Sequence, residues 1–303
     1  MHGSVSDLAS LTRHFVRVSR ETCSRELIAS LPDFEEVHSI LDEKDLNRRL
    51  GSIGSGFENR RSVFAFLDPD DSNVPLIFFE AAFELGTNKN VRDILSGGDH
   101  FRGRPDTVVP YSISNCKNSK TKGVRGLGLA LILRTREVLN RTHRHITNLV
   151  TTSPVPQLTR WVSEDLNQTF LEKHDPRGLV TLSVRDFKEL AVQSSEEFAR
   201  NDEHIHEQTR RLGAMFVMFV RRGHAFNFDP VAEFHLGNGA RLDDICPNAN
   251  TPSKFSQSWG LMANYRYPAE QARIRNAENL TEARRPDCST EVWNLLRGPS
   301  IRA

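Results

Sequence analysis

The chain has 303 residues, a formal net charge of +1 and 38% hydrophobic residues, which indicates a soluble globular protein with one large domain or two small ones. Its 40 basic and 39 acidic residues are nearly balanced, so the charge favours neither a nucleic-acid backbone nor an anionic membrane as a partner. Four cysteines without CxxC spacing, and apolar runs no longer than stretches such as GAMFVMFV, exclude a disulfide framework, a zinc site and a membrane-spanning segment, and favour the cytoplasm.

In chain order, the first predicted elements are two helices and a hairpin. Helices are expected over residues 22–29 and 42–50, and the second has acidic residues in its first turn and basic residues later, as the helix dipole favours. After the glycine-rich GSIGSG, two apolar runs at 61–68 and 74–83 flank a turn-forming DPDDSN. These two runs predict a β-hairpin.

Strand and helix signals alternate in the next part of the chain. We expect a strand at 108–114, an apolar-to-basic helix at 127–142 and a strand at 145–153. Residues 165–211 are largely polar and predict a helical insert that leads into the buried-looking GAMFVMFV. The charged residues 268–303 predict one or two peripheral helices.

The first chemical motif is KGVRGLG, residues 122–128, between a predicted strand and the helix that begins near Leu127. Its glycines allow backbone N–H groups to approach a ligand, and the positive end of the following helix favours a pyrophosphate. Two alternatives stay open: the glycines only turn the chain, and Lys120 and Lys122 are only solvated charges. The pattern is not the dinucleotide GxGxxG, and no acidic residue obviously follows at the end of the next strand.

A second motif is TTSPVPQLTRW, residues 151–161. Proline after Ser153 keeps the serine out of the helical region, so we expect a strand to end there with the hydroxyl at its carboxyl end, a common place for α/β sites. The alternative is a Ser-Pro turn that only starts a helix at Leu158.

Histidines in two other stretches are candidate functional groups. We interpret FHLGNGARL as an apolar strand followed by a Gly/Asn turn, so that His235 is either an acid or base or a buried structural histidine. His204 and His206 have metal-ligand spacing for a strand, but their surroundings predict a helix, on which the two imidazoles diverge. We therefore expect no metal there.

Taken together, the motifs resemble the malonyl-CoA decarboxylase family. Two blocks at the family's spacing, FHLGNGA and GLMANYRY, are the most specific, and the resemblance spans about residues 16–267. In the family's order, the matching blocks are RVSRETCSRELIASLPDFEEVHSI, ENRRSVFAFLDPDDSNVPLIFFEAAFELG, YSISNCKNSKTKGVRGLG, TTSPVPQLTRW, DPVAEFHLGNGARL and SQSWGLMANYRY.

The resemblance implies an α/β (α+β) protein with the GNAT-like acyltransferase fold and a central mixed sheet. It places a catalytic domain at 16–267, which leaves 1–15 as an N-terminal extension; the composition adds the helical insert at about 165–211 and a C-terminal helical tail at 268–303. The family's catalytic serine and histidine correspond to Ser153 and His235, and a tyrosine that lines the same site corresponds to Tyr267. The family's CoA-binding loop corresponds to Lys122, Gly123, Val124, Arg125, Gly126, Leu127 and Gly128.

The implied reaction is loss of CO2 from malonyl-CoA or a related malonyl-type thioester, in fatty acid metabolism or biosynthesis. Loss of CO2 leaves an enolate, so the site must stabilise charge on the thioester oxygen and then protonate carbon. We expect His235, titrating near neutrality, to deliver the proton, and Ser153 to orient the breaking bond by a hydrogen bond to the carboxylate or the thioester. The thioester is the electron sink, so no metal and no cofactor beyond the CoA moiety is expected.

Several positions depart from the family's pattern. Family members usually carry a helical domain used in assembly before the catalytic domain, whereas residues 1–15 precede the resemblance here, so a homo-oligomer stays an open expectation. The glycine loop has an extra residue and a lysine-rich approach, so the carrier is CoA or the phosphopantetheine of an acyl carrier protein. Gln157 and the altered loop at 243–253 border the site and leave the acyl group open.

Two other classes of function are compatible with these motifs. A GNAT-type acyltransferase, alone or coupled to decarboxylation, would pass the acyl group to an amine or thiol acceptor. A non-catalytic CoA-binding or assembly protein would need the altered loop to close the site, but the presence of Ser153, His235 and Tyr267 together argues against it.

Overall fold

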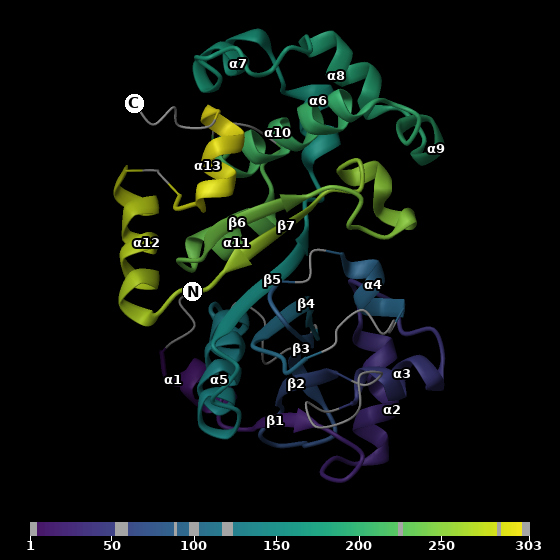
Figure 1. The fold of residues 1–303 in the computed structure, drawn as a ribbon. Helices are drawn as coiled ribbons and strands as arrows, with labels where there is room; N and C mark the ends of the chain where they lie inside the picture. Colours follow the sequence, from purple (N-terminus) through teal and green to yellow (C-terminus); the bar gives the residue numbers. More distant parts are fainter. Residues whose placement is uncertain are drawn as a thin grey trace. The chain divides into compact units, whose positions relative to one another are not determined.

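The computed structural model describes residues 5–51, 60–87, 90–96, 103–116, 124–223, 227–283 and 286–298 (Figure 1). The chain forms two compact units. The first contains residues 1–88 and 93–150, and the second contains residues 89–92 and 151–303. Each unit is described by itself below.

The first unit is built on an antiparallel sheet with the strand order β1-β2-β3-β4, to which β5 adds in parallel beside β4. The β4–β5 pairing joins the first residues of the two strands, Thr107 with Asn148 and Val108 with Leu149. The strands are β1 Phe15–Val18, β2 Arg61–Leu67, β3 Pro75–Glu84, β4 Thr107–Asn115 and β5 Asn148–Pro154, and the helices are α1 Val5–Leu11, α2 Arg25–Phe34, α3 Glu43–Arg49, α4 Val91–Ser96 and α5 Leu127–Thr142.

Every residue of β2 is buried, because helices cover both faces of this part of the sheet. Val63 and Ala65 pack with apolar residues of α2 and α3. On the alternate face Phe64 stacks with Phe15, over which the α5 residue Arg134 lies. A strand covered on both faces reads as a continuous apolar run, which is why RSVFAFL shows no alternation.

The second unit contains the end of β5, the antiparallel pair of β6 and β7 in the order β5-β7-β6, and most of the helices. In this unit α10 packs against β6 and α13, and α11 packs against α12 and β6. The strands are β6 Arg241–Cys246 and β7 Met262–Arg266, and the helices are α6 Leu158–Glu164, α7 Gln168–His174, α8 Val184–Ala191, α9 Ser195–Phe198, α10 Glu203–Phe219, α11 Pro230–Gly237, the 3-10 helix η2 Pro252–Gln257, α12 Glu270–Ala283 and α13 Thr290–Arg297.

The α/β fold with a central mixed sheet is confirmed, and so are most of the predicted elements. The hairpin is β2–β3, the helix predicted over 127–142 is α5 with the same bounds, and the helix predicted over 42–50 is α3 between the caps Asp42 and Leu50. The helix predicted over 22–29 is displaced: α2 begins after Ser24, whose hydroxyl caps it, and continues to Phe34.

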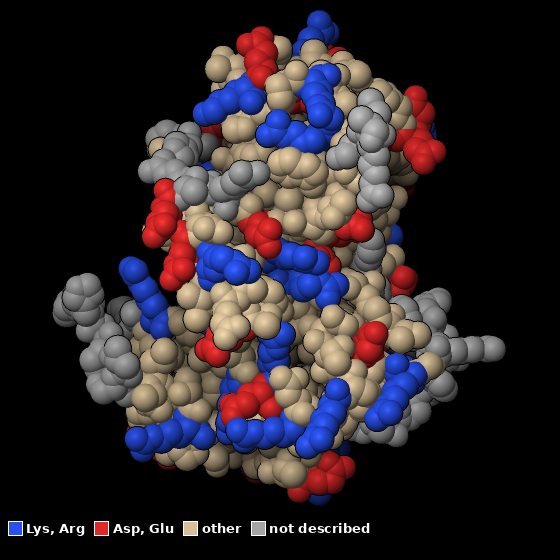
Figure 2. All heavy atoms as spheres, turned by 60° about the vertical axis from the view of Figure 1, so that its left-hand side comes forward, with Lys and Arg blue, Asp and Glu red and all other residues tan. Residues whose placement is uncertain are grey.

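The distribution of charged side chains and the state of the four cysteines agree with the expectations from the composition. Figure 2 shows acidic and basic side chains interspersed over the face drawn. Cys23, Cys116, Cys246 and Cys288 are free thiols. The helices of the described ranges are too short or too polar to cross a membrane.

Candidate active site

Ser153 lies at the carboxyl end of β5, as predicted from the proline that follows it. The side chain is only 7% exposed, and its Oγ donates a hydrogen bond to Oγ1 of Thr151 at 3.1 Å. The two hydroxyls meet because residues two apart on a strand point to the same face. The helix α6 begins at Leu158, so the Ser-Pro turn both ends a strand and leads into a helix.

His235 lies on the helix α11, and the predicted strand at this position is wrong. Asp229 caps the helix and Pro230 occupies its first turn, so FHLG forms the last turn of a helix. A short apolar run has the same composition in a buried strand and a buried helix, and periodicity alone does not separate them. The Asp-Pro pair that precedes the run is the signal that would have indicated a helix.

The predicted turn after His235 is present. Gly239 has φ of +82°, and a Cβ at this position would lie 1.9 Å from the carbonyl oxygen of Arg273 in α12. Glycine is therefore required both for the left-handed conformation and for the close packing of α11 on α12. This packing fixes the end of the helix next to His235.

A chain of hydrogen bonds joins the three predicted catalytic residues. Nε2 of His235 lies 3.0 Å from Oγ of Ser153, and Nδ1 of His235 lies 2.9 Å from the hydroxyl of Tyr267. His235 is 3% exposed and Tyr267 is 1% exposed. Ser153, His235 and Tyr267 thus come from a strand end, a helix end and the segment after β7 to one buried point in the second unit.

Burial sets the protonation of this chain. It lowers the pKa of His235 to about 3, instead of the near-neutral value expected from the sequence, and it raises the pKa of Tyr267 well above its ordinary value. Without substrate the imidazole is therefore neutral and the phenol is protonated. Since Ser153 donates to Thr151, we assign the proton of His235 to Nε2, which donates to Ser153, while Nδ1 accepts from Tyr267.

Asp229 holds the start of α11. Its Oδ1 accepts hydrogen bonds from the backbone N–H groups of Val231 and Ala232, both at 2.9 Å, and its Oδ2 accepts from N–H of Gln157 at 3.4 Å. One carboxylate thus touches the helix that carries His235 and the turn that follows Ser153. Burial raises the pKa of Asp229 to about 6, against the lowering effect of these N–H groups.

The end of β5 is held by a second buried side chain, Asn264 of β7. Its Nδ2 donates to the carbonyl oxygen of Thr151 at 3.1 Å and to Oγ1 of Thr152 at 3.0 Å. Its Oδ1 accepts from the thiol of Cys246 at 3.0 Å. Sequence reasoning missed Asn264 and Asp229, although an amide inside the apolar run GLMANY is a signal of a buried polar anchor.

The predicted CoA-binding loop is described in part. Lys122 and Gly123 lie outside the described residues, and Val124, Arg125, Gly126, Leu127 and Gly128 lie in the first unit. Gly126 precedes α5 with φ of +88°, and no side chain caps the helix. The first-turn N–H groups have no partner within the helix, as at any helix N-terminus, and α5 is 16 residues long.

Two other features lie apart from this hydrogen-bonded chain. His204 lies on α10, where its Nε2 is 2.8 Å from Oγ1 of Thr181, and the described residues contain no group of His, Cys, Asp or Glu that could hold a metal.

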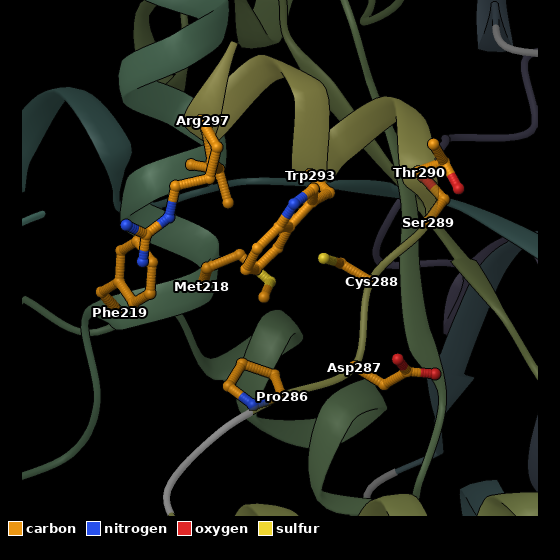
Figure 3. Close-up of a pocket in the computed structure, with 10 residues that line it drawn as sticks. Met218, Phe219, Pro286, Asp287, Cys288, Ser289, Thr290, Trp293 and Arg297 are labelled. Carbon is orange, nitrogen blue, oxygen red and sulfur yellow. The ribbon is translucent and has the colours of Figure 1, made fainter. Parts of the chain in front are cut away.

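A cavity of about 580 Å³ lies between the end of α10 and α13, where Met218, Cys288 and Trp293 face one another (Figure 3). Ser153, His235 and Tyr267 do not line this cavity.

The fold and the site define an α/β protein with a buried serine–histidine pair at the carboxyl end of a strand. Residues 14–302 match the family model of the malonyl-CoA decarboxylase C-terminal domain. The chain belongs to this family, and the resemblance seen in the sequence is confirmed.

Named relatives and solved structures agree with this assignment. Mitochondrial malonyl-CoA decarboxylase of Anser anser anser is 27% identical over an alignment of 278 residues, and the match covers 84% of this chain and 52% of that protein. The enzyme of Rattus norvegicus is 27% identical over 267 residues, with 81% and 52% covered. The chain thus spans about half the length of the curated relatives it matches.

Crystal structures of two bacterial malonyl-CoA decarboxylases have a similar fold. The structure from Agrobacterium vitis has a TM-score of 0.77 and 28% identity, and the match covers 96% of this chain and 69% of that one. The structure from Rhodopseudomonas palustris has a TM-score of 0.72 and 25% identity, with 95% and 68% covered.

Proposed function

We propose that this protein is a carboxy-lyase that decarboxylates malonyl-CoA, or a related malonyl-type acyl thioester, to acetyl-CoA or the corresponding acyl thioester and CO2. The observation that carries the proposal is the buried hydrogen-bonded chain Thr151–Ser153–His235–Tyr267 in a chain of the malonyl-CoA decarboxylase family. A serine and a histidine alone are compatible with many reactions, and membership of the family is what favours this one.

The proposed chemistry uses the thioester as the electron sink. When substrate binds, Ser153 transfers its hydrogen bond from Thr151 to the malonyl group and orients the C–CO2 bond perpendicular to the thioester plane, so that the electrons of the breaking bond enter the carbonyl. CO2 leaves and an enolate remains. Water exclusion around the buried pair strengthens each hydrogen bond to that charge.

Protonation of the enolate carbon completes the reaction. A neutral His235 is a weak acid, but the thioester enolate is a strong base, so a relay is sufficient: Ser153 gives its proton to carbon, Nε2 of His235 gives its proton to Ser153, and Tyr267 gives its proton to Nδ1. When the product leaves, a solvent proton is taken up at Nε2 of His235 and the proton on Nδ1 returns to Tyr267, which restores the starting tautomer. No step needs a metal ion.

We place the pyrophosphate of the carrier at the N-terminus of α5. Gly126 in the left-handed conformation, the uncapped first turn and the dipole of a 16-residue helix support this position. The carrier is CoA or the phosphopantetheine arm of an acyl carrier protein, and comparing turnover of malonyl-CoA with that of malonyl-carrier protein separates the two.

We further propose that the protein is cytoplasmic and forms a homo-oligomer. Light scattering of the purified chain tests the oligomeric state.

The decisive experiment is a mass-spectrometric assay with malonyl-CoA and methylmalonyl-CoA. We expect conversion of at least one of them to acetyl-CoA or propionyl-CoA without an added acceptor, and a loss of at least about 100-fold in kcat for Ser153→Ala and for His235→Ala. Ser163→Ala is the matched control, because Ser163 lies on α6 and its hydroxyl donates only to the carbonyl of Thr159. If the wild-type protein turns over neither thioester, the proposed decarboxylation is contradicted. If it turns over a thioester only when an amine or thiol acceptor is present, the function is acyl transfer instead.

A further inference from the structure

Tyr265 lies flat against His235 and has no part in the hydrogen-bonded chain. It is on β7, and Tyr267 follows two residues later, just past the end of the strand; both residues contact the imidazole. Its ring centroid is 4.5 Å from that of His235 and the ring planes differ by 18°. The residue has 0% exposure, so a phenol as large as Tyr265 is fully enclosed beside the proposed proton donor.

The hydroxyl of Tyr265 has no hydrogen-bond partner among the described residues. Two other buried aromatic residues in this unit are paired: the hydroxyl of Tyr267 meets Nδ1 of His235 at 2.9 Å, and Nε1 of Trp259 donates to the carbonyl of Leu190 at 3.0 Å. A buried hydroxyl without a partner destabilises a folded protein, and phenylalanine in its place would remove that cost. The ring stacked on His235 thus carries a buried donor whose hydrogen-bonding capacity the described residues leave unused.

The charges around Tyr265 keep its proton in place. Burial and the nearby carboxylate of Asp229 raise the pKa of Tyr265 well above its ordinary value, and the guanidinium of Arg221 acts in the opposite direction. The phenol therefore stays neutral at all physiological pH values and can only donate to an acceptor oxygen or accept from a donor. The malonyl group brings oxygen acceptors in its carboxylate and in its thioester carbonyl.

We propose that the hydroxyl of Tyr265 is a substrate-binding donor, which hydrogen-bonds an oxygen of the malonyl group while its ring holds the imidazole of His235 in place. This inference rests on the proposed function, because that function supplies the malonyl group. Tyr265 is thus a fourth functional side chain of the site, beside Ser153, His235 and Tyr267.

The test is Tyr265→Phe, which removes the hydroxyl and keeps the stacked ring. We expect kcat/KM for malonyl-CoA to fall by about 10- to 100-fold, the range for a hydrogen bond to a charged or charging group. We expect the melting temperature to rise by about 2 °C, because an unpaired buried hydroxyl is removed. A purely structural tyrosine would not give changes of opposite sign in activity and stability.

Thr135→Val is the matched control. Thr135 is a buried residue of α5 in the first unit, and its hydroxyl also lacks a partner among the described residues. Its removal should raise the melting temperature similarly and leave kcat/KM unchanged. Unchanged kcat/KM in Tyr265→Phe, or a lower melting temperature, would overturn the proposal, since the hydroxyl would then have no substrate contact or a structural partner.

Binding calorimetry keeps this inference separate from the proposed function. In the Ser153→Ala background, where turnover is prevented, malonyl-CoA and acetyl-CoA are titrated with and without Tyr265→Phe. Weaker binding of malonyl-CoA alone assigns the contact to the carboxylate, and weaker binding of both assigns it to the thioester carbonyl. If adding Tyr265→Phe to Ser153→Ala changes the Kd of neither malonyl-CoA nor acetyl-CoA, the inference is overturned, whether or not the wild-type protein shows turnover.

Discussion

At the residue scale, the site shows how burial changes what a histidine can do. An exposed His235 would titrate near its ordinary value of 6.5, whereas the buried residue has a pKa of about 3 and stays neutral. In the proposed mechanism it therefore acts through its hydrogen bonds to Ser153 and Tyr267 and not as an imidazolium. The FHL motif singled it out as a candidate, but its protonation depends on the packing of Tyr265 and Tyr267, which no local sequence pattern reveals.

The low pKa of His235 predicts a pH-dependent loss of stability. Between pH 6.5 and pH 3 the unfolded chain binds a proton at this residue and the folded chain does not, so the free energy of unfolding falls as the pH falls. The contribution is about 1.4 kcal/mol per pH unit between pH 6 and pH 4. His235→Gln removes the titration, and urea unfolding of both proteins over this range should show a shallower slope for the variant. Parallel curves would show that the folded protein binds the proton at His235 as readily as the unfolded chain.

At the element scale, the best predictions came from long or strongly punctuated segments. The helix α5 was predicted with its bounds because an apolar-to-basic pattern runs over 16 residues, and the β2–β3 hairpin because a polar turn separates two apolar runs. The eight residues of α11 are too few for a helical period to be distinguished from a strand. Its state is decided by the local cap at Asp229 and by packing on α12 and β6, of which only the packing is a tertiary effect.

The cap of α11 gives a prediction at this scale. Asp229→Ala removes the acceptors of Val231 and Ala232 and also the contact with Gln157, so the helix that carries His235 loses its fixed start. We expect a destabilisation of about 1–2 kcal/mol by thermal unfolding and a loss of about 10-fold in kcat. Helix start and imidazole position are coupled because a helix is rigid along its axis.

Asp202→Ala is the control for that prediction. Asp202 caps α10 in the same way, through a hydrogen bond from N–H of Ile205 to Oδ1 at 3.0 Å, but α10 carries none of the proposed catalytic residues. The control should lose a similar amount of stability and keep its kcat. Full activity in both variants would show that Asp229 only stabilises its helix.

At the scale of the whole chain, each unit contains one of the two proposed recognition features. Ser153, His235 and Tyr267 belong to the second unit, and the glycine turn at Gly126 belongs to the first. The resemblance predicted both from separate blocks of sequence, because each depends on a short motif. The residues that support the motifs, such as Asn264 and Asp229, come from distant segments and emerge only when the chain is folded.

Ligand-induced stabilisation of the folded chain tests the carrier site. A ligand that binds only the folded protein stabilises it by about 2.7 kcal/mol at a concentration 100-fold above Kd, and CoA at saturation should therefore raise the melting temperature by several degrees. Gly126→Ala places a side chain at φ of +88°, which costs about 1–2 kcal/mol and moves the N–H groups of the first turn of α5. We expect this variant to lose most of the CoA-induced shift.

Gly178→Ala separates backbone strain from carrier binding. Gly178 also has a positive φ, +63°, with no atom within 4 Å of an added Cβ, and it lies in the second unit outside the proposed site. It should melt earlier than the wild-type protein yet keep the full CoA-induced shift. Pantetheine, which lacks the pyrophosphate, should shift the wild-type and Gly126→Ala proteins by equal amounts, because the substitution affects only the N–H groups proposed to bind phosphate. A full CoA-induced shift in Gly126→Ala would instead place the pyrophosphate elsewhere on the chain.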